Sequence, residues 1–165
     1  RQRRLLASRK TSAAEMLKKF DLERPDVRVA LETLDQSPFL TATCEDHSLK
    51  LMLDTGATMT TLFAKSWNRV SIEYANPPPP QGMAWGVTGE SPVQGGRLRE
   101  LSVGPLRLLD VPVAVTGVEA AAARRGSSSV PFDGVLGMNV LSRFLVVIDG
   151  PEGVLYLAEY ASTAE

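Results

Sequence analysis

The chain has 165 residues, a formal net charge of −1 and 44% hydrophobic residues, which is enough for one domain with a buried core. A charge this close to neutral argues against a nucleic-acid-binding protein that depends on attraction to phosphate. His47 is the only histidine, which excludes a histidine-clustered metal site and argues against a serine triad. Cys44 is the only cysteine, so no intrachain disulfide can form.

The chain divides into an N-terminal extension, residues 1–35, and a single domain, residues 36–160. A basic cluster opens the extension and is interpreted as a solvated linker. A capping box at residues 12–15 predicts a helix, and alternating apolar residues predict a strand at residues 27–35. Because the chain begins with Arg1 rather than Met, we expect it to be a fragment of a longer protein.

The domain opens with two predicted strands, residues 39–44 and 49–53, which form a hairpin. Turn-forming residues at 45–48 connect them, so His47 is expected to be an exposed turn residue. A short helix can follow before residue 70. The four prolines at 77–80 exclude the interior of a helix or sheet and indicate a stiff loop rather than a polyproline ligand.

Glycines recur between residues 82 and 96, a spacing that favours a mobile hairpin over a packed strand. Strand character resumes at residues 98–103 and again at 106–115. Residues 116–130 read as a flexible loop, and residues 144–157 predict a final hairpin. Many short strands separated by turn signals indicate an all-β fold.

The tetrad Asp54-Thr55-Gly56-Ala57 directly follows the apolar strand at residues 49–53. Gly56 allows the backbone to turn tightly without a Cβ near the carboxylate, and the Thr55 hydroxyl can bind a partner loop. Two carboxylates that share one proton can hydrolyse a peptide bond, because the ionised one acts as general base and the protonated one as general acid. The chain has one such loop, so this chemistry requires two copies of the chain.

A plain β-turn is the alternative interpretation of the tetrad, because Asp and Gly are ordinary turn residues. Two observations weigh against it. The tetrad ends an apolar run, and a second signal lies far downstream, Val135-Leu136-Gly137 followed by a helix-like stretch at residues 138–144.

Together these pieces resemble the retropepsin-like aspartic peptidases, the retroviral proteases and their cellular and bacterial relatives. The resemblance covers about residues 36–158 and includes the tetrad, a glycine-bearing segment at residues 85–93 and the segment 133–141. It implies an all-β, closed β-barrel-like retropepsin (acid protease) fold. One short C-terminal helix and a flap hairpin that closes over substrate would complete it.

The resemblance also implies a homodimeric aspartic endopeptidase without metal or cofactor, in which Asp54 of each subunit is catalytic. Thr55 and Gly56 would support the loop. Trp85 could cap a substrate pocket or pack at the base of the flap. The expected partners are an extended peptide or protein substrate and a second copy of the chain, with no nucleic acid. The implied substrate-binding residues are Ala57, Thr58, Trp85, Val87, Thr88 and Gly89.

Two other functions remain open at this point. One is a catalytically silent retropepsin-like module for dimerisation or peptide binding, and the other is a monomeric β-barrel in which Asp54 is only a turn residue. Because Ala57 supplies no hydroxyl to the carboxylate, we expect a peptidase of this type to work at mildly acidic to near-neutral pH. The compartment stays unknown, and a soluble domain, alone or within a longer or membrane-tethered protein, fits the sequence.

Overall fold

A computed structural model describes residues 27–34, 37–70, 81–86, 89–116 and 131–159, together with Glu15 and Lys18. Strands dominate, and no helix in these segments is long and apolar enough to cross a membrane. The first strands and helix are β1 (Val27–Ala30), β2 (Glu32–Leu34), β3 (Ser37–Cys44), β4 (His47–Leu53), β5 (Thr61–Phe63) and α3 (Ala64–Val70). The remaining elements are β6 (Gln81–Gly86), β7 (Gly89–Val103), β8 (Leu106–Thr116), β9 (Gly134–Leu136), α5 (Met138–Leu141), β10 (Phe144–Asp149) and β11 (Val154–Glu159).

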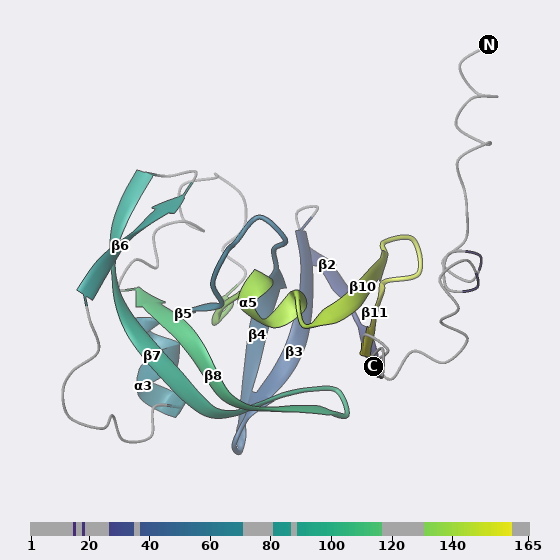
Figure 1. Ribbon diagram of the computed structural model, residues 1–165, viewed down its shortest axis with the longest axis horizontal. Helices are drawn as coiled ribbons and strands as arrows, with labels where there is room; N and C mark the ends of the chain where they lie inside the picture. The colour runs from purple at the N-terminus through teal and green to yellow at the C-terminus, as the bar shows by residue number, and fades with distance from the viewer. Residues whose placement is uncertain are drawn as a thin grey trace, which may run out of the picture.

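The strands form two sheets. The larger has eight strands in the order β2-β3-β4-β9-β5-β8-β7-β6, and a further pairing of β3 with β7 partly closes it into a barrel. The smaller has three strands in the order β1-β11-β10. In Figure 1 the β6–β7 hairpin lies at one end of the molecule and the small sheet at the other, with α5 between them. The predicted all-β fold is confirmed, and the predicted closed barrel is seen as a partly closed ring of strands.

The β3–β4 hairpin builds one wall of the core. Its side chains alternate between buried and outward positions, as expected for strands with one face on a core. Leu49 and Leu51 have no exposed surface, which confirms the predicted interior strand that leads to Asp54. The turn is shorter than predicted, because His47 already pairs with Cys44 and belongs to β4.

Strand β9 lies between the two strands that flank the Asp54 loop. It runs parallel to β4 and antiparallel to β5, so the chain leaves β4, passes over the end of β9 and returns as β5 on its far side. The packing is close: a Cβ at Gly134 would lie 2.1 Å from the carbonyl oxygen of Thr61. Only glycine fits at this position, which explains the Gly that opens β9.

Strands β7 and β8 form a long antiparallel ribbon that continues into the β6–β7 hairpin. The prediction that strand character resumes only at residue 98 is wrong, because β7 is continuous from Gly89 to Val103. Gly95 and Gly96 pair with Ala114 and Val113 rather than interrupting the strand. The helix predicted at residues 138–144 is also shorter, and Phe144 opens β10 instead.

The small sheet joins the two ends of the described chain. The strand predicted at residues 27–35 forms as two short strands, β1 on β11 and β2 on β3. The final hairpin is confirmed as β10 and β11. Of the loop expected at residues 116–130, Thr116 belongs to β8 instead, and the rest lies outside the described residues. Most of the expected N-terminal helix lies outside them too, although Glu15 and Lys18 are helical. The domain boundary at residue 36 stays a prediction.

Candidate active site

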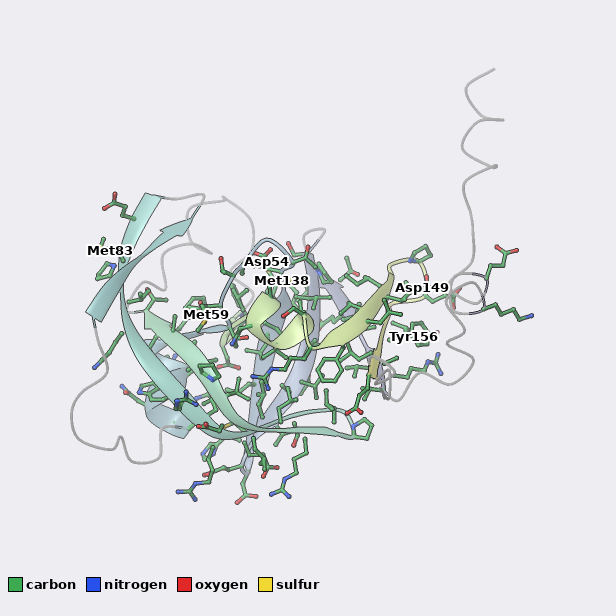
Figure 2. All side chains as sticks on the ribbon, viewed as in Figure 1. Asp54, Met59, Met83, Met138, Asp149 and Tyr156 are labelled. Atoms are coloured by element: carbon green, nitrogen blue, oxygen red, sulfur yellow. The ribbon has the colours of Figure 1, made fainter. Side chains whose placement is uncertain are left out.

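Asp54 lies at the carboxyl end of β4, where the strand ends and the loop begins. Its backbone N–H donates to the carbonyl oxygen of Leu136 at 3.2 Å, which extends the pairing of β4 with β9 by one residue. The side chain is half-buried. Because pairing with a central strand fixes the backbone of Asp54, the side chain leaves the backbone at a fixed position near the surface (Figure 2).

The loop curls around the Asp54 carboxylate. The N–H of Gly56 donates to Oδ1 of Asp54 at 2.8 Å, and the N–H of Ala57 donates to the Asp54 carbonyl oxygen at 3.2 Å. A Cβ at Gly56 would lie 3.1 Å from the same Oδ1, so a glycine allows this approach without displacing the carboxylate. Within the described chain, Gly56 supplies the only hydrogen bond to this carboxylate.

Helix α5 holds the far side of the loop. The N–H of Met138 donates to the carbonyl oxygen of Ala57 at 2.8 Å, and the N–H of Asn139 donates to that of Thr58 at 3.1 Å. The first N–H groups of a helix have no partner within the helix, and here the loop provides acceptors for two of them. The loop and α5 therefore form one hydrogen-bonded unit.

A buried polar cluster lies beneath this unit and consists of Thr60, Gly137 and Asn139. Thr60 has no exposed surface; its hydroxyl donates to Oδ1 of Asn139 at 2.9 Å and accepts from the N–H of Gly137 at 3.1 Å. Asn139 Oδ1 also accepts from the Thr60 N–H, and its Nδ2 donates to the carbonyl oxygen of Pro112 at 2.8 Å. Buried polar atoms are thereby satisfied, and the cluster ties the loop to β8 and α5.

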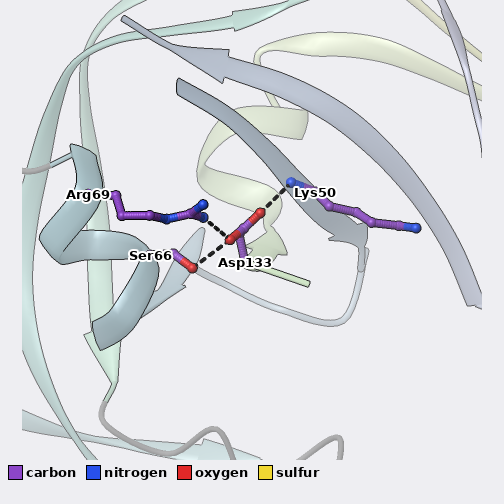
Figure 3. A network of polar contacts seen from close by, with 4 residues as sticks. All are labelled: Lys50, Ser66, Arg69 and Asp133. Atoms are coloured by element: carbon purple, nitrogen blue, oxygen red, sulfur yellow. Dashed lines mark hydrogen bonds and ion pairs between the residues drawn. The ribbon is translucent and has the colours of Figure 1, made fainter. Parts of the chain in front are cut away.

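Asp133 forms a second polar network, on the side of α3 (Figure 3). Its Oδ1 accepts from the Ser66 hydroxyl at 2.7 Å and forms an ion pair with Arg69. Its Oδ2 accepts from the backbone N–H of Lys50 at 2.8 Å, and its backbone carbonyl accepts from the N–H of Phe63 at 3.0 Å. One half-buried carboxylate thus connects α3 and β4 to the start of β9.

The structure brings part of the predicted site together. Asp54, Thr55, Gly56, Ala57 and Thr58 share one loop, in which Ala57 is half-buried and Thr55 and Thr58 are exposed. Their roles remain predictions.

The other predicted substrate-binding residues belong to the β6–β7 hairpin. Trp85 lies in β6 opposite Glu90, and Gly89 in β7 opposite Gly86. Val87 and Thr88 lie outside the described residues. In the view of Figure 2 the hairpin, labelled at Met83, and the Asp54 loop rise on the same side of the molecule. Whether the hairpin is a flap stays a prediction.

A groove of about 580 Å³ lies at the base of this hairpin and does not include the Asp54 loop. Apolar side chains make up most of its lining: Ala64, Met83, Pro92, Val93 and Val115, with Gly82 and Gln94. The groove therefore lies between the hairpin and α3, over the paired strands β7 and β8, and none of the described residues that line it is titratable.

The sequence alone did not point to Thr60 and Asn139, which hold the loop, or to Asp133, which connects α3 and β4 to β9. Thr60 and Asn139 are 79 positions apart, and Ser66 and Asp133 are 67 apart. Neither spacing marks a pair in the sequence. The nearest signal in the sequence is the segment 133–141, which is part of the family resemblance and contains both Asp133 and Asn139.

The chain is similar to proteins of known family and structure. The family model described as "Aspartyl protease" matches residues 40–140. A retropepsin-like aspartic protease from Rickettsia conorii superposes with a TM-score of 0.57 at 18% identity, covering 78% of this chain and 95% of that one. EIAV protease in complex with the inhibitor HBY-793 has a TM-score of 0.49 at 19% identity, covering 67% and 90%. A search of curated proteins by sequence returned no match.

The matched residues contain both the Asp54 loop and the β9–α5 segment on which the loop rests, so the family match and the geometry concern the same structure. The chain therefore belongs to the aspartyl protease family and has the retropepsin-like fold.

Proposed function

We propose that the chain is an aspartic endopeptidase that works as a homodimer, with Asp54 of each subunit in one shared catalytic site. The observation that carries the proposal is the Asp54 loop itself: a carboxylate at the end of a central strand, approached closely by Gly56 and held from below by α5. One loop supplies one carboxylate, whereas the reaction needs two that share a proton. A symmetric dimer supplies the second.

In this mechanism the two carboxylates lie on either side of one water molecule. Like charges at short range cannot both ionise, so one carboxyl keeps its proton. The ionised carboxylate takes a proton from the water as it attacks the scissile carbonyl carbon, and the protonated one donates to the carbonyl oxygen. The tetrahedral adduct then breaks its C–N bond as the carboxyl that took the proton from water gives it to the leaving nitrogen, so no covalent bond to the enzyme forms. The Thr55 hydroxyl, on the exposed part of the loop, would bind the partner's loop and keep the carboxylates aligned.

Substrate would bind as an extended strand between the loop and the β6–β7 hairpin. Backbone groups of an added strand provide affinity, and side-chain pockets provide selectivity. Ala57 and Thr58 would line subsites on the loop, and Trp85, Val87, Thr88 and Gly89 would line them on the hairpin. Closure of the hairpin would exclude water and orient the peptide.

The test is cleavage of a diverse peptide pool between mildly acidic and neutral pH by the wild-type chain and by Asp54→Asn. The variant preserves the shape of the side chain but cannot share a proton, so we expect the rate to fall by at least about a hundredfold. Circular dichroism and thermal unfolding of the variant serve as the folding control. Equal cleavage by both proteins would refute the role of Asp54.

The pH profile of the same cleavage reaction tests the environment of the carboxylates. In the described chain no side-chain hydroxyl donates to Asp54, and only the Gly56 N–H does. The reaction needs one carboxyl ionised and the other protonated, so the activity should be highest between mildly acidic and near-neutral pH and fall on either side. A profile that peaks below about pH 3 would contradict this prediction.

A further inference from the structure

Strand β9 supports the Asp54 loop, although it pairs with β4 over only three residues. The Leu136 carbonyl oxygen at its end accepts from the Asp54 N–H, and α5 begins two residues later. The register pairs Leu51 with Gly134, Met52 with Val135 and Leu53 with Leu136. A slip of β9 by one residue would move both supports of the loop and turn every side chain of the strand to the other face. The position of Asp54 therefore depends on the register of β9 on β4.

Asp133 fixes this register at the start of β9. Its backbone N–H donates to the carbonyl oxygen of Lys50 at 2.8 Å, and its Oδ2 accepts from the Lys50 N–H, also at 2.8 Å. One residue thus binds both backbone polar groups of Lys50. The neighbours of Asp133 in the sequence are Phe132 and Gly134, and neither has a side chain that accepts a hydrogen bond. A slip by one residue in either direction would therefore lose the bond to the Lys50 N–H.

Two side chains of α3 orient the Asp133 carboxylate (Figure 3). The Ser66 hydroxyl donates to Oδ1 at 2.7 Å, and Arg69 forms an ion pair with the same oxygen. With Oδ1 held from α3, Oδ2 faces the Lys50 N–H. Ser66 is buried, whereas the Arg69 side chain is 47% exposed. Because an exposed ion pair contributes little, the hydrogen bonds to Ser66 and Lys50 are the contacts that hold the carboxylate.

Phe132 holds the residue before β9 in the same register. Its ring packs edge-on against Phe39 of β3 and Phe63 of β5, with ring centroids 5.4 Å and 5.0 Å apart. The Phe63 N–H also donates to the Asp133 carbonyl oxygen at 3.0 Å. The start of β9 is thereby tied to β3, β4, β5 and α3, and Asp133 supplies the contacts to three of these four elements.

We propose that Asp133 is a positioning residue for Asp54: it fixes the register of β9 on β4 and so keeps the Leu136 carbonyl and α5 where they support the Asp54 loop. The inference rests on the proposed function, since it gives Asp133 a part in the same reaction. Asp133 acts through β9 and contacts no reacting atom. A catalytic group displaced by about 1 Å can lose about a hundredfold in rate, so the register of β9 affects turnover.

The first test measures kcat and KM in the full chain. Asp133→Ala removes the acceptor of the Lys50 N–H, so kcat should fall by about 10- to 100-fold while KM changes less than about threefold. Arg69→Ala removes the exposed ion pair but keeps that acceptor, so kcat should stay within about twofold of wild type. Asp133→Asn in the Arg69→Ala background, where Arg69 does not compete for the amide oxygen, should bring kcat back to within about threefold of wild type.

Val103→Ala is the control for a loss of stability without a loss of positioning. Val103 is fully buried in β7, at the end of the strand that pairs with Leu106. Val103→Ala and Asp133→Ala should both lower the free energy of unfolding in urea, the first through a cavity and the second through unpaired polar groups. At a temperature where both variants are folded, only Asp133→Ala should lower kcat.

The second test reads the loop itself by amide hydrogen exchange and does not depend on cleavage. The N–H groups of Asp54 and Met138 are bound to Leu136 and Ala57. In Asp133→Ala these two amides should exchange at least about tenfold faster than in wild type, relative to the amides of β7 and β8 in the same protein. In Val103→Ala that ratio should stay as in wild type, because global unfolding affects all of these amides together.

The outcomes separate this inference from the proposed function. If Asp133→Ala keeps the wild-type kcat, or if its Asp54 and Met138 amides are as protected as in wild type, the inference is wrong, whereas Asp54-dependent cleavage by wild type would leave the peptidase intact. Equal losses of kcat in Arg69→Ala and Asp133→Ala would also overturn it. If wild type cleaves nothing, the proposed function falls, and faster exchange in Asp133→Ala would still establish that Asp133 holds the Asp54 loop.

Discussion

Thr60 holds the Asp54 loop in place through its hydrogen bonds, although it does not belong to the tetrad. Its hydroxyl donates to Asn139 and accepts from the Gly137 N–H, and no part of the residue is exposed. A buried hydroxyl with two partners is costly to lose, because the Gly137 N–H is left without a hydrogen bond and Asn139 Oδ1 keeps only the bond from the Thr60 N–H.

Thr60→Val tests this role with almost no change in volume. We expect the free energy of unfolding to fall by about 1–3 kcal/mol, because Gly137 and Asn139 each lose a buried partner. Cleavage should also decline as the loop loosens. Thr61→Val is the matched control: its hydroxyl makes one longer contact, 3.3 Å to the Met59 carbonyl oxygen, and the change should cost less than about 0.5 kcal/mol. If urea denaturation gave the same loss in the free energy of unfolding for both variants, the cluster of Thr60, Gly137 and Asn139 would add nothing to stability.

The sequence allowed the prediction of Asp54 but not of the residues that hold its loop in place. The tetrad Asp-Thr-Gly-Ala can be recognised from the sequence alone, because the carboxylate, the turn and the apolar strand before them are adjacent in the chain. Thr60 and Asn139 gain their meaning only from a contact across 79 positions. Thr and Asn are ordinary turn and surface residues in a sequence, and nothing local marks these two as buried.

Strand β9 lies between β4 and β5 and so fixes the positions of the two strands that flank the Asp54 loop. At its end Gly137 packs against the loop: a Cβ there would lie 2.5 Å from the carbonyl carbon of Met59 and 2.8 Å from the N atom of Thr60. These are backbone atoms, which cannot move aside as a flexible side chain can. The glycine is therefore required by the close approach of two chain segments.

Gly137→Ala should destabilise the protein by roughly 2–4 kcal/mol, because the added methyl group pushes the loop away from α5. Gly150→Ala is the control, since a Cβ at Gly150 meets nothing within 4 Å, and its cost should stay below about 0.5 kcal/mol. Chemical denaturation measures both. A Gly137→Ala protein as stable as the control would mean that β9 and the loop are not packed as described.

The elements themselves were predictable where a signal is local and strong. The β3–β4 and β10–β11 hairpins follow from alternation and turn residues. The continuity of β7 was missed because Gly95 and Gly96 weaken a strand in isolation, whereas here β8 pairs with both. Helix α5 is shorter than its apolar run suggested, since Phe144 is taken into the small sheet.

For the whole molecule, the retropepsin-like fold explains how one carboxylate, that of Asp54, is fixed at the end of a central strand of an eight-stranded sheet. In the proposed shared site, a second chain would supply the second carboxylate. The order of the strands could not be derived from composition or periodicity, because β9 reaches its neighbours from the far end of the chain. The resemblance carried by the tetrad and by Val135-Leu136-Gly137 predicted the fold as a whole but no order of its strands.

In the proposed shared site, activity needs one Asp54 from each of two chains. The most direct measurement mixes wild type with Asp54→Asn at constant total concentration, after time for the subunits to exchange, and follows peptide cleavage. If both carboxylates are required, only wild-type pairs are active, and an equal mixture should retain about one quarter of the full rate. A rate of about one half, falling in proportion to the wild-type fraction, would mean that each chain works alone and would contradict the shared site.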